Sequence, residues 1–140
     1  MSIDFQKALK DLGDEFSIRI FYACESGSRA WGFDSSDSDY DIRFLYVRKT
    51  SDYLTVFPIR DTVEKTTGLL DMVGWDVKKS LFLARKSNMS QLEWLHSPIV
   101  YKDNTALSSL LRETLLTTLD KFALYQSYVG VAHNHFLACL

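Results

Sequence analysis

Two aspartates at the start of a long apolar run constrain the fold of this chain most. Asp39 and Asp41 lie in the segment SDSDYDIRFLYV, which becomes strongly apolar from Ile42 onward. The run predicts a central strand over residues 40–48. Because residues two apart on a strand point to the same face, this strand would present both carboxylates together. A carboxylate at the start of an apolar strand costs free energy of desolvation unless a cation compensates its charge.

The rest of the chain predicts an α/β (α+β) domain, in which a small mixed sheet is flanked by helices and followed by a helical C-terminal tail. Helices are expected over residues 4–15, 76–86, 103–118 and from 120 onward, and further strands over residues 16–24, 62–67 and 69–75. A turn that opens into a short helix is expected over residues 26–31. Gly13 is expected to end or interrupt the first helix, and Gly68 permits a turn between the last two strands.

The pattern divides the chain into a core over residues 1–102 and a helical segment over residues 103–140. The apolar pattern of the last helix still runs at Leu140, without a glycine, a proline or a basic last turn to stop it. An abrupt natural end and a chain shortened from a longer parent both account for this pattern, and the sequence favours neither.

Composition limits the functional classes. The 140 residues carry a net charge of −2, so the overall field does not favour nucleic acid, and such a substrate would need a local patch. No signal peptide is visible before the first helix, and no apolar run approaches the roughly 20 residues of a membrane span. Cys24 and Cys139 are expected to be reduced, buried thiols. Together these features predict a cytoplasmic protein without a membrane partner.

A pair of aspartates alone is a weak signal, because a solvated acidic turn explains most such pairs. Asp34 and Asp37, in the loop before the pair, are explained well enough by turn formation and solvation. A calcium loop that starts at Asp37 fails, because Ile42 and Arg48 stand where glycine and glutamate are required.

A glycine and a serine upstream of the pair favour a functional site over a solvated acidic turn. Gly27 lets the backbone approach a phosphate closely. Ser28 adds a hydroxyl group, and Arg29 offers a guanidinium fork for phosphate. The segment therefore combines a cradle for a triphosphate with a platform of hard oxygen ligands for metal.

These residues resemble the motif of a known protein superfamily. Gly27-Ser28, ten residues and then Asp39-Tyr40-Asp41 resemble the signature of the DNA polymerase β-like nucleotidyltransferase superfamily. The longer strings ESGSRAWGF and SDSDYDIRFLYV are similar to a narrower branch, the predicted nucleotidyltransferases associated with RNA ligases. WDVKKSLFLARKSN and EWLHSPIVY match the same branch more moderately, so the resemblance covers about residues 20 to 101 in order.

The resemblance implies an enzyme that moves a nucleoside monophosphate from a nucleoside triphosphate such as ATP to an acceptor hydroxyl and releases pyrophosphate. Metal, Mg²⁺ or Mn²⁺, would be held by Asp39, Asp41 and a third carboxylate at Asp76, which would also orient or deprotonate the acceptor. Gly27 and Ser28 would hold the triphosphate, and Arg29 is a plausible phosphate contact.

The third carboxylate is the least specific of these assignments. Asp61, Glu64 and Asp71 lie near Asp76 in the sequence, and Asp76 also suits the N-cap of the helix that follows it.

Other properties stay open at the level of sequence. The acceptor is an RNA end, a protein hydroxyl or a small molecule. A partner chain or a homo-oligomer is considered through the C-terminal helices. The alternative function is a non-catalytic nucleotide-binding or regulatory module with the same fold. The aromatic residues beside the acidic loop are expected to serve packing rather than base stacking: Trp31, Phe33 and Tyr40.

Overall fold

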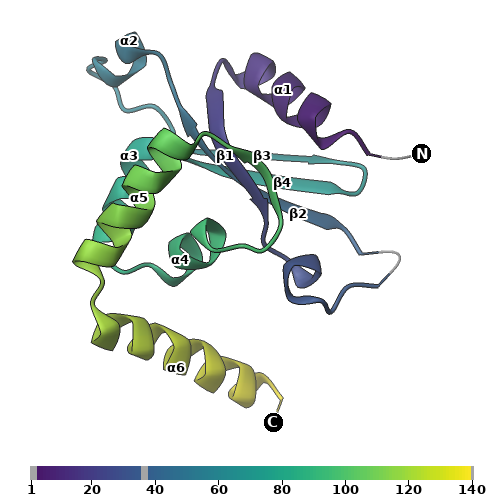
Figure 1. Ribbon diagram of the computed structural model, residues 1–140, viewed down its shortest axis with the longest axis vertical. Helices are drawn as coiled ribbons and strands as arrows, with labels where there is room; N and C mark the ends of the chain where they lie inside the picture. Colours follow the sequence, from purple (N-terminus) through teal and green to yellow (C-terminus); the bar gives the residue numbers. More distant parts are fainter. Residues whose placement is uncertain (1–2, 36–37, 140) are drawn as a thin grey trace.

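A five-stranded mixed sheet forms the centre of the computed structural model, which describes residues 3–35 and 38–139 (Figure 1). Its strand order is β3-β4-β2-β1-β5, with β2 in the middle and parallel to β4, while the other pairs are antiparallel. The predicted α/β (α+β) class and the predicted central strand are confirmed. The strands are β1 (Arg19–Glu25), β2 (Tyr40–Val47), β3 (Thr62–Thr67), β4 (Leu70–Asp76) and β5 (Val100–Asp103).

Seven helical elements connect and flank these strands within the described residues. They are α1 (Phe5–Phe16), the 3-10 helix η1 (Ser28–Trp31), α2 (Thr50–Tyr53), α3 (Val77–Arg85), α4 (Met89–Leu95), α5 (Thr105–Thr118) and α6 (Lys121–Ala138). The prediction that Gly13 ends or interrupts the first helix was wrong. That helix continues to Phe16 and ends at Ser17, which has a left-handed backbone with a φ of 52°.

The two faces of the sheet are covered by separate hydrophobic cores. On one face, Leu9 and Leu12 of α1 pack against strand residues that include Ile42 and Phe44. On the other face, α3, α4 and α5 cover Leu45 and its neighbours through a set of buried side chains: Ala84, Trp94, Leu95, Leu111 and Leu115. Burial of apolar side chains on both faces stabilises β2 in its position between β1 and β4.

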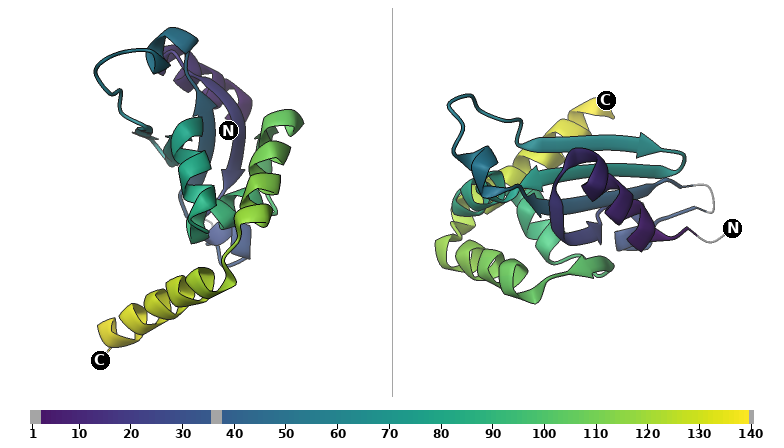
Figure 2. Two further views of the ribbon diagram at one scale, coloured as in Figure 1. Left: turned by 90° about the vertical axis from the view of Figure 1, so that its left-hand side faces the viewer. Right: turned by 90° about the horizontal axis from the view of Figure 1, so that it is seen from above.

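The two C-terminal helices behave differently from each other. α5 contributes Leu111 and Leu115 to the core, although it belongs to the segment expected as a helical tail. α6 buries none of its residues and runs away from the sheet (Figure 2). Whether a second copy or another chain covers α6 stays a prediction, which sedimentation equilibrium would test. None of the helices in the described part of the chain is long and apolar enough to cross a membrane.

Both cysteines were expected to be buried, and only Cys24 is. Cys24, near the end of β1, is buried and free, and burial raises the pKa of its thiol to about 12. Cys139 is also free, but it is exposed, because α6 does not pack against the core.

The register of the parallel pair determines which side chains meet. Asp41 of β2 lies opposite Asp71 of β4, and Tyr46 lies opposite Asp76. β3 and β4 form an antiparallel hairpin whose turn contains Gly68 with a φ of 58°, as predicted. The sheet therefore has two distinct ends, with η1 at the Asp41 end and α2 at the other (Figure 1).

Candidate active site

The Gly-Ser pair and the carboxylate strand meet where β1 turns into η1. The amide of Ser26 donates to the carbonyl oxygen of Asp41 at 2.9 Å. A Cβ atom built on Gly27 would lie only 1.8 Å from Oδ2 of Asp41. Gly27 has an extended backbone, with a φ of −86°, so the site needs glycine for space rather than for conformation.

Hydrogen-bond donors lie free beside this carboxylate. Within the described residues, the amides of Gly27 and Ser28 donate to no acceptor, and Ser28 is exposed. The Ala30 amide, by contrast, closes the turn on the carbonyl oxygen of Gly27 at 3.0 Å. The turn thus presents unpaired N–H groups and a hydroxyl next to Asp41, which is a suitable arrangement for an anionic oxygen.

A second carboxylate joins Asp41 from the neighbouring strand. Asp71 lies directly opposite Asp41 in the parallel register, and alternation puts both side chains on the same face. Nη2 of Arg43 lies 3.4 Å from Oδ1 of Asp41 and 3.0 Å from Oδ2 of Asp71. Both carboxylates are about one-third exposed (33% and 36%), whereas Arg43 is 18% exposed.

Asp39 lies next to this pair in the chain. It is exposed and immediately precedes β2, two residues before Asp41. Asp37, assigned to the connecting loop, is outside the described residues. Within the described part of the chain, no group of three acidic, histidine or cysteine side chains is already gathered closely enough to hold a metal ion. Arg43 fills the space between the two carboxylates that converge, and carboxylate oxygens are the hard ligands that Mg²⁺ and Mn²⁺ prefer.

Asp76 does not lie with these carboxylates. Its register position is five residues along β4 from Asp71, a separation of about 16 Å at the usual rise per residue. Its side chain accepts the amide of Lys78 at 2.8 Å, as the N-cap of α3, and the hydroxyl of Tyr53 at 2.8 Å. It is only 3% exposed. The structure therefore gives Asp76 the capping position and brings Asp71, one of the alternatives, to Asp41.

Arg29 is already engaged within its own loop. Its guanidinium donates to Asp34 at 3.0 Å and to the carbonyl oxygen of Ser38 at 2.6 Å, and it stacks over the ring of Tyr40. These contacts join η1 to Asp34, Ser38 and Tyr40. A phosphate would therefore have to compete with three protein partners for this side chain.

Glu25 is a residue that the sequence reasoning did not single out. It is fully buried (0% exposed), and its carboxylate accepts the amide of Asp41 at 2.8 Å and the hydroxyl of Tyr101 at 2.6 Å. Burial, followed by the hydrogen bond to Glu25, raises the pKa of Tyr101. Glu25 thus joins the start of β2 to β5. A charged residue at the end of an otherwise apolar strand was the signal that could have identified it.

The aromatic residues beside the acidic loop fall into two groups. Tyr40 packs edge-on against Phe5, as expected of a packing residue. Trp31 and Phe33 are 57% and 85% exposed, so the expectation that they pack was wrong. Ala30 is the buried residue of η1, and Phe33 lies beyond the end of that short helix.

Comparison with known proteins places this geometry in a family context. The sequence profile of the family described as "RNA repair pathway DNA polymerase beta family" matches residues 1–140. The chain is also 41% identical over 128 residues to the uncharacterized protein YcgL of Bacillus subtilis (strain 168). The matched region is 91% of this chain and 49% of the relative, so the chain spans about half the length of this curated relative.

Proposed function

The chain belongs to the RNA repair pathway DNA polymerase beta family, and from this premise we propose that it is a metal-dependent nucleotidyltransferase. It would move a nucleoside monophosphate from a nucleoside triphosphate, such as ATP, to an acceptor hydroxyl on an RNA end, a protein or a small molecule. The observation that carries the proposal is the contact of Gly27 with the Asp41 carboxylate, which puts free amides beside a pair of acids.

The Gly-Ser turn and Asp71 have separate roles in the proposed reaction. The amides of Gly27 and Ser28 and the Ser28 hydroxyl bind oxygens of the triphosphate. The acceptor oxygen attacks the α-phosphorus, the bond from that phosphorus to the bridging oxygen breaks, and pyrophosphate leaves. Asp71 receives the proton of the acceptor hydroxyl. Positioning of the two reactants and stabilisation of charge supply most of the acceleration.

Asp39, Asp41 and Asp71 are the proposed ligands for Mg²⁺ or Mn²⁺. When bound, such an ion would neutralise the charge that develops on the phosphate oxygens and lower the pKa of a coordinated hydroxyl. Arg43 must turn away from at least one carboxylate for these residues to act as ligands, because its guanidinium now lies between Asp41 and Asp71.

Substitutions of the two candidates for the third carboxylate, Asp71 and Asp76, should cause different defects. Asp71→Ala should slow nucleotide transfer by roughly a hundredfold, because it removes one prearranged charge from the reacting groups. Asp76→Ala should keep transfer within a fewfold of the parent, but it should lower the free energy of unfolding by about 1–3 kcal/mol, since it removes a helix cap and the acceptor of the Tyr53 hydroxyl proton. Transfer rates and urea unfolding measured on the same samples would distinguish the two defects.

Asp11→Ala is the matched control for this pair, because Asp11 is exposed on α1 and makes no ion pair within the described residues. It should change neither quantity. The reverse result, with transfer lost in Asp76→Ala and kept in Asp71→Ala, would return the catalytic role to Asp76.

Transfer of label tests the function itself. Each of the four NTPs, labelled on the α-phosphate, would be offered with Mg²⁺ or Mn²⁺ together with RNA, a protein extract or a small-molecule extract. The expected result is metal-dependent movement of the α-label to one acceptor class, with one pyrophosphate released per transfer. Release of label as free monophosphate without any acceptor product would contradict nucleotidyl transfer.

A non-catalytic nucleotide-binding or regulatory module is the second candidate, and the position of Arg43 favours it. A cation from the chain itself already bridges Asp41 and Asp71 and offsets part of their charge. On this alternative, nucleotide binds with or without Mg²⁺ and no label moves under any of the conditions above.

A further inference from the structure

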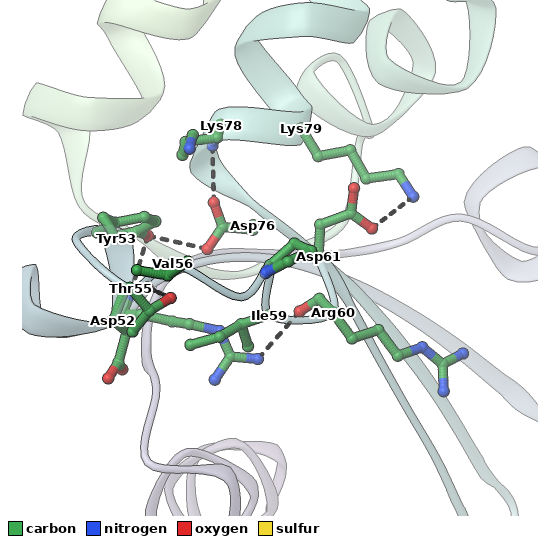
Figure 3. A pocket seen from close by; sticks show the side chains of 12 residues that line it. Asp52, Tyr53, Thr55, Val56, Ile59, Arg60, Asp61, Asp76, Lys78 and Lys79 are labelled. Atoms are coloured by element: carbon green, nitrogen blue, oxygen red, sulfur yellow. Dashed lines mark hydrogen bonds and ion pairs between the residues drawn. The ribbon is translucent and has the colours of Figure 1, made fainter.

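A cavity of about 360 Å³ lies at the other end of the sheet from Asp41. Figure 3 shows the side chains that line it. It is built where the parallel strands β2 and β4 end, between α2, the loop that follows α2 and the first turn of α3. Ligands of α/β sheets commonly bind outside the carboxyl ends of parallel strands. The proposed transfer reaction uses none of the residues that line this cavity.

Two of the four cationic side chains that line the cavity form no ion pair within the described residues. The cationic residues are Arg48, Arg60, Lys78 and Lys79, and three others are anionic, Asp52, Asp61 and Asp76. Lys79 is paired with Asp61 at 3.1 Å, and Arg60 is paired with Glu64 at 3.3 Å outside the cavity. The Asp52 carboxylate points away from Asp76 and the two lysines in Figure 3.

Arg48 and Lys78 are the cations that remain available. Arg48 donates to the backbone oxygen of Arg60 at 3.2 Å, and the Nζ atom of Lys78 lies 5.8 Å from the centre of the Tyr53 ring. Within the described residues, neither forms an ion pair with a carboxylate. Asp76 keeps its negative charge in the wall of the cavity, and its two oxygens accept hydrogen bonds from the Tyr53 hydroxyl and the Lys78 amide rather than from either cationic side chain.

A buried hydroxyl behind the cavity also lacks a partner. Tyr46 is 0% exposed, and within the described residues its hydroxyl forms no hydrogen bond. Burial raises the pKa of Tyr46, and the charged groups that act on it, Arg48, Asp76 and Asp61, all line the cavity. Because buried polar groups are nearly always paired, a hydrogen-bonding group bound beside Arg48 and Asp76 would satisfy this hydroxyl.

Size and lining restrict the class of ligand. The volume is within the range of small-molecule sites and well above what one phosphate ion fills. Val56, Pro58 and Ile59 supply an apolar part of the lining, and the first turn of α3, which Asp76 caps, contributes Lys78 and Lys79 to it. The combination suits a molecule with a phosphate group on a partly apolar body.

We infer that this cavity is a second binding site for a nucleotide-sized phosphate monoester, whose phosphate is held by Arg48 and Lys78 and whose apolar part rests on Val56, Pro58 and Ile59. The same chemistry has two sources, a free mononucleotide and the phosphorylated end of an RNA strand. The site does not depend on the transferase activity proposed above.

Equilibrium dialysis of the full chain against labelled AMP in EDTA tests this site, because chelation removes metal-dependent binding. AMP should bind saturably, and adenosine should bind at least about tenfold more weakly, since it lacks the charge-assisted contacts. Arg48→Gln/Lys78→Gln should weaken AMP binding by a similar factor. Lys7→Gln/Lys102→Gln, which removes the same charge from two exposed positions elsewhere, should leave it unchanged.

Hydrogen exchange then locates the bound AMP. Slower exchange of backbone amides in residues 48–61 and 76–79 supports the site, whereas protection confined to residues 26–30 overturns it. Equal binding of adenosine and AMP also overturns it. A 5′-phosphorylated oligoadenylate that binds more tightly than AMP identifies an RNA end as the source, and the opposite order identifies the free nucleotide.

Discussion

Asp41→Asn is expected to slow nucleotide transfer by roughly a hundred- to a thousandfold, the loss found when one prearranged electrostatic contact is removed from an active site. Asparagine keeps the shape of aspartate, so the contact with Gly27 survives while the negative charge is lost. Asp41 lies against the Gly-Ser turn and is bridged to Asp71 through Arg43. The measurement is the rate of α-label transfer at saturating NTP and metal.

Two further variants make this result interpretable. Asp11→Asn carries the same chemical change at an exposed position on α1 and should transfer at the parent rate. Asp39→Asn/Asp41→Asn should lose all transfer above background and retain its cooperative urea transition. Should the double variant turn over nucleotide as fast as the parent, the proposed mechanism would be wrong.

Gly27→Ala is the second large effect that we expect, because one methyl group is enough to disturb the site. The new carbon would lie 1.8 Å from Oδ2 and 2.6 Å from Cγ of Asp41, so either the turn or the carboxylate must move. Overpacking of this kind costs about 1–3 kcal/mol of stability. A displacement of about 1 Å at reacting groups costs on the order of a hundredfold in rate, which a kinetic assay would detect.

Gly130→Ala provides the matched comparison, since no neighbouring atom lies within 4 Å of the carbon that it adds in the middle of α6. Alanine there should keep the transfer rate and favour the helix by up to about 1 kcal/mol. If Gly27→Ala also transferred at the parent rate, the close approach of the turn to Asp41 would have no functional importance.

Local features of this fold could be predicted from the sequence because their causes are local. The alternation of Asp39 and Asp41 with their neighbours, and the apolar run after them, predicted a strand that the sheet places at its centre. Gly68 marked a turn because its positive φ is accessible to glycine at little cost. Gly13 misled the prediction, since the packing of Leu9 and Leu12 on the sheet outweighs the low helix propensity of one glycine.

The choice between Asp71 and Asp76 could not be made from sequence, because it depends on the register of two strands that are far apart in the chain. A parallel pair is aligned by tertiary packing, and here the ring of Phe44 lies over Gly74, where a Cβ atom would come within 2.0 Å of it. That fit sets Asp71 opposite Asp41. Sequence could show that Asp76 suits a helix cap, and it does cap α3.

The contacts of Arg29 and Arg43 also could not be predicted from the sequence alone. Arg29 follows the Gly-Ser pair, so its position suggested a phosphate contact, yet Asp34 and Tyr40 hold its guanidinium. Arg43 lies two residues beyond Asp41 and on the same face of the strand, which makes it an intrinsic neighbour of the site. Its bridging position became evident only when Asp71 was placed beside it.

The strand order has a consequence for how the protein acquires its site during folding. Gly27 lies in the turn after β1, Asp41 in β2 and Asp71 in β4. The hydrogen bond from Tyr101 to Glu25 closes a loop of 76 residues. Each closure costs chain entropy before any contact repays it, and pairings between distant segments form late. A nascent chain that has formed only its helices and the β3–β4 hairpin therefore has no such site. The site develops together with the fold as a whole, and any change that slows docking of β2 between β1 and β4 delays both equally.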